Sequence, residues 1–192
     1  MVNVVKKALQ ETNDPVYGVQ VLSTSHRSEA GISEANKILQ QMLNPAARGK
    51  KGIRFGSIEF REGDKVLTTQ NNYEEGYFNG DIGVIKSINN ENVEIQLSDR
   101  IVKVKRQHLG DLSLGYCISI HKSQGSEFDH AIILLPGNPA IMLKRNLLYT
   151  AITRSKKNCT VIYAPDAVKK CALSIDNTIR STYLPKLLGP QP

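Results

Sequence analysis

A dense run of polar and small residues lies between two apolar segments in the second half of the chain. Cys117–Ile120 is apolar and β-branched, the residues from His121 to Glu127 are polar or small, and Ala131–Leu135 is apolar again. Each apolar segment is typical of a buried strand. The pattern predicts a βαβ-like unit with its polar residues at one strand end, which is where open α/β sheets bind ligands.

Two arginines accompany this loop. Arg27 follows a predicted strand, and Arg154 ends a predicted helix. An arginine is charged at any working pH and forms paired hydrogen bonds with phosphate oxygens. The two arginines and the polar loop could therefore meet a polyphosphate. An arginine supplied to the γ-phosphate of a nucleotide accelerates phosphoryl transfer by several orders of magnitude.

The sequence lacks the motif that usually holds such a phosphate group. It contains no Gly-x-x-x-x-Gly-Lys-[Ser/Thr], and neither Gly49-Lys50 nor Gly63-Asp64-Lys65 fits that spacing. No acidic pair at a strand end is an obvious ligand for Mg²⁺, and no Cys, His, Asp and Glu cluster has metal-site spacing. We therefore expect the chain to complete a nucleotide site that another domain builds.

Charge is distributed unevenly along the 192 residues. The net charge is +7, but residues 55–111 carry seven Lys and Arg against ten Asp and Glu, and the remainder carries eighteen against eight. A basic surface of this kind is a common mark of phosphate-bearing partners, although a solvated surface on a basic protein explains it equally well. The three cysteines show no metal-ligand spacing, and we expect them to be reduced and buried.

The positioning elements follow from periodicity. Apolar residues recur at helical spacing in 2–11, 32–43, 140–155 and 167–173, and strand-like runs cover 16–22, 116–120, 131–135 and 159–163. Between about 60 and 109 the pattern changes to short alternating runs separated by turn signals such as Asn79-Gly80, which indicates a small antiparallel barrel or sandwich. We predict an α/β domain with a β insertion, divided as 1–54, 55–111 and 112–192, after a basic linker at 46–54.

Four segments, in order, resemble those of a known family. Ile118–Asp129 resembles motif V of superfamily 1 helicases in the form used by the RecD-like branch, and Leu148–Ser155 resembles their motif VI. The region from Val19 to Pro45 is similar to motif IV, although Ser23–Arg27 departs from the usual Ser-Pro form. Gly63–Gly83 resembles the start of the SH3-like 2B insertion of that branch.

The resemblance implies a RecA-like parallel sheet, the second RecA-like domain (2A), with an inserted SH3-like antiparallel β-barrel (2B). It further implies a C-terminal part of an ATP-dependent 5′–3′ DNA helicase, similar to the exodeoxyribonuclease V alpha-type subunit and acting in recombination and repair. ATP with Mg²⁺ would be held mainly by a missing N-terminal RecA-like domain. Its other partners would be single-stranded DNA and a RecBC-type complex, with no membrane involved and a cytoplasmic location.

The same resemblance assigns roles to individual residues. Arg27 and Arg154 would be catalytic arginine fingers, and Gln124, Gly125 and Glu127 would bind the nucleotide. The DNA-binding residues would be Ser119, His121, Lys122 and Ser123 in the loop and Asn71, Asn72, Tyr73 and Asn79 in the insertion. We expect the chain alone to hydrolyse no ATP.

Each assignment has a plainer alternative. Arg154 could cap the last carbonyls of its helix, Arg27 could be a surface arginine, and His121 could make structural hydrogen bonds. Asn79-Gly80 is first of all a turn, and Tyr73 could pack inside the barrel. The rival function is a non-enzymatic nucleic-acid-binding module, an SH3-like barrel on a basic α/β platform. A nuclease is disfavoured because no acidic or histidine cluster has metal-site spacing.

Overall fold

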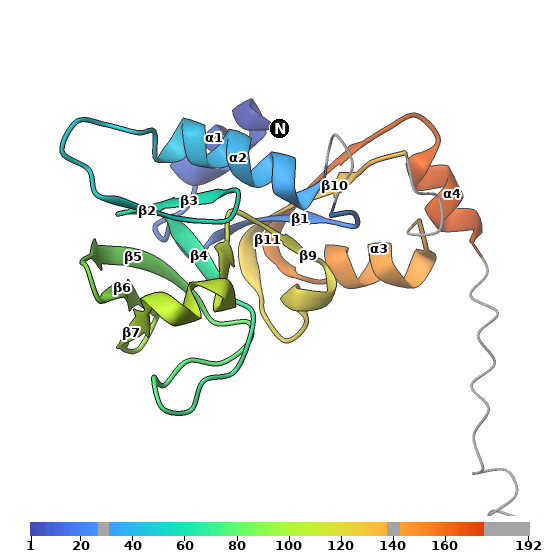
Figure 1. Ribbon diagram of the computed structural model, residues 1–192. Coiled ribbons are helices and arrows are strands. Elements are labelled where there is room, and N and C mark those ends of the chain that lie inside the picture. Colours follow the sequence, from blue (N-terminus) through green and yellow to red (C-terminus); the bar gives the residue numbers. More distant parts are fainter. Residues whose placement is uncertain (27–30, 138–142, 175–192) are drawn as a thin grey trace, which may run out of the picture.

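The structure is a computed structural model that describes residues 1–26, 31–137 and 143–174. It contains an α/β unit and an antiparallel β unit that lie side by side (Figure 1). The α/β unit is assembled from both ends of the chain, and the β unit comes from the middle. This arrangement confirms the predicted fold class of a parallel sheet with an inserted antiparallel unit.

A four-stranded parallel sheet forms the centre of the α/β unit. Its strands are β1 (Val19–Ser23), β9 (Cys117–Ser119), β10 (Phe128–Leu135) and β11 (Ser155–Tyr163), in the order β11-β10-β1-β9. All three pairings are parallel. Because β1 lies between β9 and β10, the two strands that flank the polar loop are not neighbours. A simple βαβ unit would have placed them side by side.

Helices cover both faces of this sheet, so its strands are apolar on both sides. Helices α1 (Val2–Gln10) and α2 (Ile32–Leu43) lie on one face, and α3 (Arg145–Ile152) and α4 (Ala167–Leu173) lie on the other. Side chains alternate along a strand. Ile132 and Leu134 of β10 accordingly join the core beneath α1 and α2, and Ile133 joins the core beneath α3 and α4.

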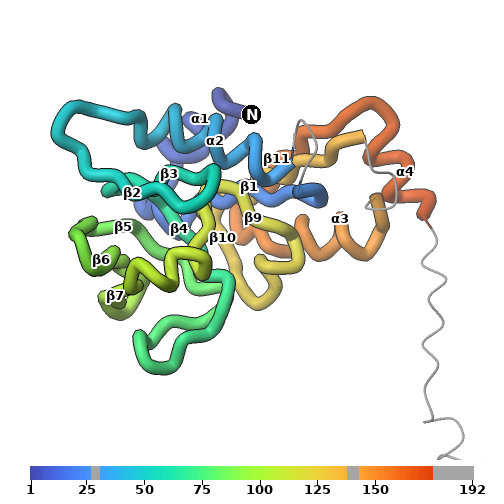
Figure 2. The backbone as a smooth tube through the Cα atoms, in the orientation of Figure 1, coloured from blue at the N-terminus to red at the C-terminus, as the bar shows by residue number. Residues whose placement is uncertain are grey.

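The antiparallel unit is a five-stranded sheet in the order β7-β6-β5-β4-β8. Its strands are β4 (Lys65–Thr68), β5 (Ile82–Ile88), β6 (Asn92–Gln96), β7 (Ile101–Lys105) and β8 (Leu112–Leu114), with the 3₁₀ helix η1 (Arg106–Asp111) before β8. In the tube view, β5, β6 and β7 lie at the end of the molecule opposite α3 and α4 (Figure 2).

A separate two-stranded hairpin precedes this sheet. Strands β2 (Gly52–Phe55) and β3 (Ile58–Arg61) pair antiparallel and bury Ile53 and Phe60. The prediction of a basic linker at 46–54 was therefore wrong for residues 52–54, which belong to β2. The predicted domain boundaries after residues 54 and 111 stay a prediction.

The two units share one hydrophobic core. Val19 and Val21 of the parallel sheet belong to the same buried cluster as Val66, Ile85 and Ile95 of the antiparallel sheet. Residues of the parallel sheet and of the inserted strands thus belong to one continuous buried cluster. The insertion is fixed to the α/β unit by burial and not only by its two chain connections.

Asp64 adds a polar junction to this shared core. Its fully buried carboxylate accepts hydrogen bonds from the side chains of Gln40 (2.6 Å), Asn44 (2.6 Å) and Tyr116 (2.9 Å) and from the backbone N–H of Arg61 (2.7 Å). A buried charge costs little only when such partners surround it. The network ties α2 to the hairpin and to the segment that leads into β9.

The three cysteines differ in their exposure. Cys117 and Cys171 are buried, but Cys159 is exposed because β11 is an outer strand of the parallel sheet, so the expectation of three buried cysteines was wrong for Cys159.

Within residues 1–26, 31–137 and 143–174, no helix has the length and apolar character needed to cross a membrane.

Candidate nucleotide and nucleic-acid site

The polar loop begins with a tight 3₁₀ turn, η2 (His121–Ser123), directly after β9. The hydroxyl of the buried Ser123 donates to the carbonyl of Ile120 (2.7 Å), and the N–H of Lys122 donates to Oγ of Ser119 (3.3 Å). Both serine side chains therefore stabilise the turn itself. Of the predicted DNA contacts in this loop, His121 is exposed and Lys122 is half-buried.

The second half of the loop is open to solvent. Gln124, Gly125 and Glu127 are exposed, and Gly125 has φ of 84°, a left-handed conformation that favours glycine. Glu127 forms an ion pair with Lys156 (3.6 Å) at the start of β11. Because both side chains are exposed, this pair contributes little to stability and leaves the carboxylate accessible.

Arg154 joins this half of the loop to the end of α3. Its Nη1 donates to the carbonyl of Ser126 (3.2 Å), and its Nε donates to the carbonyl of Thr150 (3.1 Å). The bond to Thr150 is the helix-capping contact that the plainer alternative predicts. The bond to Ser126, 28 residues away in sequence, also places the guanidinium at the solvent-open half of the loop. The side chain is partly exposed.

The two halves of the loop lie at different ends of the sheet. Ser119 pairs with Ser23, at the carboxyl ends of β9 and β1, whereas Phe128 pairs with Ser155, at the amino ends of β10 and β11. The expectation that all the polar residues gather at one strand end was therefore wrong. The loop runs from one edge of the sheet to the other, since parallel strands require a return across their length.

At the carboxyl edge, the start of the loop faces a cavity of about 260 Å³ between α2, the β2–β3 hairpin and β9. Ser119 and Lys122 line it together with His26, Asn36 and Lys37. Burial lowers the pKa of Lys122 from its ordinary value, because desolvation disfavours the charged ammonium. Arg27, the residue after His26, lies outside the described residues.

The loop of the antiparallel unit that contains Asn71, Asn72, Tyr73 and Asn79 is ordered by its own side chains. Asn72 donates to the hydroxyl of Tyr77 (3.2 Å) and accepts from the N–H of Glu75 (3.0 Å), while Asn71 accepts from the N–H of Asn79 (2.8 Å). Asn79-Gly80 forms the predicted turn, with the N–H of Asp81 bonded to the carbonyl of Phe78 (3.0 Å).

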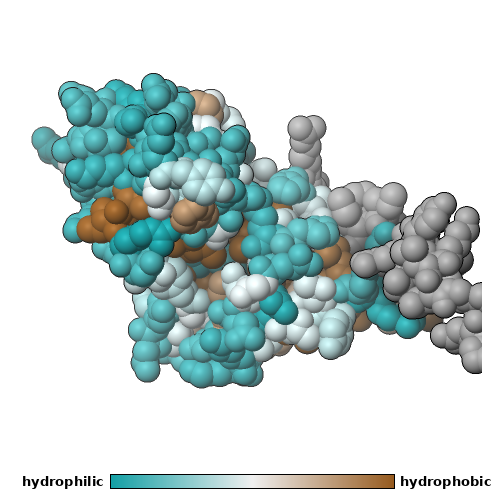
Figure 3. All heavy atoms as spheres, turned by 90° about the horizontal axis from the view of Figure 1, so that it is seen from below, coloured by the Kyte–Doolittle hydropathy of each residue, from teal (hydrophilic) through white to brown (hydrophobic). Residues whose placement is uncertain are grey.

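Tyr73 stands out from this loop because it is 80% exposed. Its ring meets the edge of Phe78 at 5.6 Å between centroids and 72° between planes, and the guanidinium of Arg100 lies 5.7 Å from the Phe78 ring. The alternative that Tyr73 packs inside the barrel is therefore wrong. Figure 3 shows a largely hydrophilic face with smaller hydrophobic areas.

Sequence reasoning missed several polar residues that shape this region. Asn36 and Gln40 lie on the buried side of α2, and the buried Asn44 follows its last residue. Asn36 bonds twice to the backbone of Cys117, just before the loop. The sequence contained a signal for Asn36, because this residue follows Ala35 and lies one turn from Ile32 and Leu39 on the apolar stripe of the predicted helix. A polar residue in such a stripe needs a buried partner.

Two family models match the chain over these units. Residues 35–98 match the ATP-dependent RecD-like DNA helicase SH3 domain, and residues 114–162 match the UvrD-like helicase C-terminal domain. Among solved structures, a Pif1 helicase studied for DNA unwinding at forked duplexes is 18% identical, has a TM-score of 0.55, and is matched over 83% of this chain and 42% of that one. This likeness shows a shared fold.

Helicases with similar sequences identify the family more closely than the shared fold does. The ATP-dependent RecD2 DNA helicase of Deinococcus radiodurans is 34% identical over 138 residues, 72% of this chain and 19% of the relative. The RecBCD enzyme subunit RecD of Haemophilus influenzae is 30% identical over 171 residues, 88% of this chain and 25% of the relative. The chain thus spans about a fifth to a quarter of the length of these relatives.

The fold and the family models define the class: a superfamily 1 helicase domain, with a RecA-like parallel sheet and an inserted SH3-like barrel. Within that class, the SH3 domain model and the RecD relatives place the chain in the RecD-like branch, as a C-terminal portion of such a helicase.

Proposed function

We propose that the chain acts as the second motor domain of an ATP-dependent DNA helicase, which moves 5′ to 3′ on single-stranded DNA. One observation carries the proposal. The bond between Arg154 and Ser126 brings the guanidinium at the end of α3 to the solvent-open half of the polar loop. A guanidinium beside an exposed glycine in a left-handed conformation is a donor set that fits a phosphate group.

The residues of this chain would supply part of a nucleotide site, and another domain would supply the rest. Arg154, and Arg27 outside the described residues, would stabilise the charge that develops on the transferring γ-phosphoryl group. Gln124 and Gly125 would approach the nucleotide with the loop backbone, and Glu127 would accept a hydrogen bond from the ribose. A RecA-like domain with a P-loop would hold most of ATP and its Mg²⁺.

Single-stranded DNA would contact two surfaces of the chain. Ser119, His121 and Lys122 would face phosphates at the carboxyl edge of the sheet, where His26 and Lys37 add basic side chains. Ser123, whose side chain is buried, would act only by holding the turn. On the barrel, the loop that holds Asn71, Asn72 and Asn79 would present Tyr73 to a base, since exposed aromatic rings are stacking platforms. The polar loop would couple the two events, because one half belongs to each site.

The names of the relatives support two further proposals. A RecBC-type complex is one setting for the chain, since several relatives are RecD subunits of the RecBCD enzyme, and a free-standing helicase such as RecD2 is the other. Either setting implies recombination or repair of DNA in the cytoplasm.

The proposal is tested with the pure chain and a fluorescent oligothymidine. We expect binding that weakens steeply as salt rises, because phosphate contacts release counterions, and no ATP hydrolysis above background with or without DNA. ATP turnover by the pure chain would contradict the split nucleotide site. Failure to bind the oligonucleotide at low salt would contradict the DNA-contacting role.

A further inference from the structure

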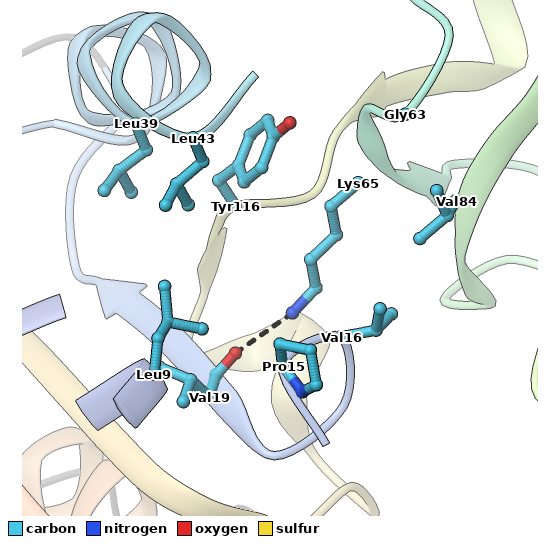
Figure 4. Close-up of a pocket in the computed structure, with 10 residues that line it drawn as sticks. All are labelled: Leu9, Pro15, Val16, Val19, Leu39, Leu43, Gly63, Lys65, Val84 and Tyr116. Atoms are coloured by element: carbon cyan, nitrogen blue, oxygen red, sulfur yellow. Dashed lines mark hydrogen bonds between the residues drawn. The ribbon is translucent and has the colours of Figure 1, made fainter. Parts of the chain in front are cut away.

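A small cavity lies where the α/β unit and the inserted barrel meet, away from the polar loop. It has a volume of about 180 Å³ and is lined by residues of α1, β1, α2, β4 and β5 and by the turn before β1. Most of the lining is aliphatic, including Leu9, Val16, Leu39 and Val84 (Figure 4). The cavity is partly open to solvent and is therefore reachable by a small molecule.

One cation faces this apolar cavity. Lys65, the first residue of β4, is 6% exposed, and its Nζ donates to the backbone carbonyl of Val19 at 3.0 Å (Figure 4). An ammonium group has three N–H donors, so a single carbonyl satisfies it poorly. Burial lowers the pKa of Lys65 from 10.5 to about 7, since desolvation disfavours the charged form.

The acidic groups near the amine are committed to other partners. Asp14, whose charge acts against the lowering of the Lys65 pKa, accepts the N–H groups of Val16 (3.1 Å) and Tyr17 (2.9 Å). Tyr116 lines the cavity, but its hydroxyl donates to Asp64. Among the described residues, no carboxylate lies within ion-pair distance of Nζ, so the site has a cation without a counter-ion.

We propose that this cavity is a binding site for a small apolar carboxylate, an aromatic or branched acid of about the size of benzoate. The hydrocarbon part would lie against Leu9, Leu39 and Val84, and the carboxylate would accept a hydrogen bond from Nζ of Lys65. The volume fits such a ligand, because an apolar cavity of about 150 Å³ is enough for benzene. The carboxylate supplies the negative charge that the site lacks.

A ligand in this cavity would contact both the barrel and the parallel sheet. Lys65 belongs to the barrel, and Val19 is the first residue of a sheet strand, so the occupied site would bridge the two units. A ligand that binds only the folded chain raises its thermal stability, and the rise grows with the logarithm of ligand concentration above the dissociation constant. The proposal does not depend on the helicase function, because none of the residues proposed for nucleotide or DNA lines this cavity.

The affinity of the site for a carboxylate should depend on pH, because the amine of Lys65 gains and loses a proton. The carboxylate binds best when the amine is protonated, so affinity should be greatest below pH 7 and should fall by about tenfold for each pH unit above it. A neutral analogue of the same shape, such as benzyl alcohol, should bind more weakly at pH 6 and show no such dependence.

The test uses sodium benzoate with the chain, followed by NMR line shifts and by the thermal midpoint. We expect saturable shifts that weaken from pH 6 to pH 8. Lys65→Met, which keeps the length and the apolar stem, should lose the benzoate response at least tenfold. Val84→Phe, which narrows the cavity without touching the amine, should also lose it, so the proposal stays testable if one variant folds poorly.

Two results would overturn the proposal. One is an equal response of the wild type and Lys65→Met to benzoate. The other is a benzoate affinity at pH 6 no greater than that of benzyl alcohol. An unliganded thermal midpoint recorded for each variant separates loss of the site from loss of the fold.

Discussion

The side-chain amide of Asn36 completes the outer edge of the parallel sheet by pairing with the backbone of Cys117. Nδ2 of Asn36 donates to the carbonyl of Cys117 at 2.8 Å, and Oδ1 accepts from its N–H at 2.9 Å. Within the part of the chain that the structure describes, strand β9 has β1 on one side and no strand on the other. The amide therefore takes the place of a missing strand at a buried position and fixes the strand that leads into the polar loop.

Replacing Asn36 should cost the chain substantial stability. Asn36→Leu leaves the buried N–H and carbonyl of Cys117 without partners, which costs about 2–4 kcal/mol in the free energy of unfolding. Urea unfolding followed by circular dichroism measures the change. Gln41→Leu, an exposed position on the same helix, is the matched control and should stay within about 0.5 kcal/mol of the wild type. A small effect at Asn36 would show that water replaces the amide.

Substitution of Arg154 should affect catalysis in the complete helicase more than nucleotide binding. Arg154→Ala should lower DNA-stimulated ATP turnover by about three orders of magnitude or more, as loss of an arginine finger does. Arg154→Lys should recover little, because a lysine cannot reproduce the two-pronged contact. Turnover number and nucleotide affinity are measured separately.

The matched control is Arg145→Ala at the other end of α3, where the guanidinium donates to the carbonyl of Ala172. It should retain turnover if it folds. Near-normal turnover in Arg154→Ala would leave the arginine with its capping role alone. It would then favour the alternative of a nucleic-acid-binding module without catalytic function.

Removing the ring of Tyr73 should weaken binding of single-stranded DNA by the chain. Stacking of one base on an aromatic side chain contributes about 1–3 kcal/mol, so Tyr73→Ala should raise the dissociation constant roughly 5- to 150-fold, while Tyr73→Phe should change it little. Fluorescence anisotropy measures both. Tyr163→Ala removes an exposed tyrosine at the end of β11 and should bind normally. Equal losses at the two positions would point to a general effect of surface change.

The buried Lys65 should make stability depend on pH. Its pKa is lowered to about 7 in the folded chain, so between about pH 7 and its unfolded value the unfolded chain binds more protons. The free energy of unfolding therefore rises with pH across this window, by at most about 1.4 kcal/mol per pH unit. Lys65→Met should lack this rise.

The comparison is best made by urea unfolding between about pH 7 and about pH 8.5. Above that range the thiols of the unfolded chain lose protons, whereas burial raises the pKa of the Cys117 thiol in the folded chain, and this effect has the opposite sign. Parallel pH profiles for wild type and Lys65→Met would show that Lys65 keeps its charge in the folded state.

Sequence periodicity predicted the elements with strong local signals. Helix α2 runs over the predicted residues 32–43, because apolar side chains recur at helical spacing between Gly31 and the helix-ending Asn44-Pro45. The β2–β3 hairpin was missed although Ile53 and Phe60 are buried, since four-residue strands that also contain the exposed Arg54 and the half-buried Glu59 resemble a basic, polar linker.

The order of the strands and the geometry of the site depend on contacts that no local pattern contains. The placement of β1 between β9 and β10 results from packing between distant segments, and it moves Ser119 and Glu127 to different ends of the sheet. The pairing of Arg154 with Ser126 also joins separate segments. The motif resemblance predicted which residues would be near the nucleotide, but not the distances between them.

The common core of the two units has a consequence for how force passes through the protein. Val66 and Ile85 of the barrel pack in the same cluster as Val19 and Val21 of the sheet, so rotating the barrel on its own would expose buried aliphatic surface on both sides. We therefore expect the barrel to resist rotation against the sheet. A displacement of the sheet should then carry the Tyr73 loop with it.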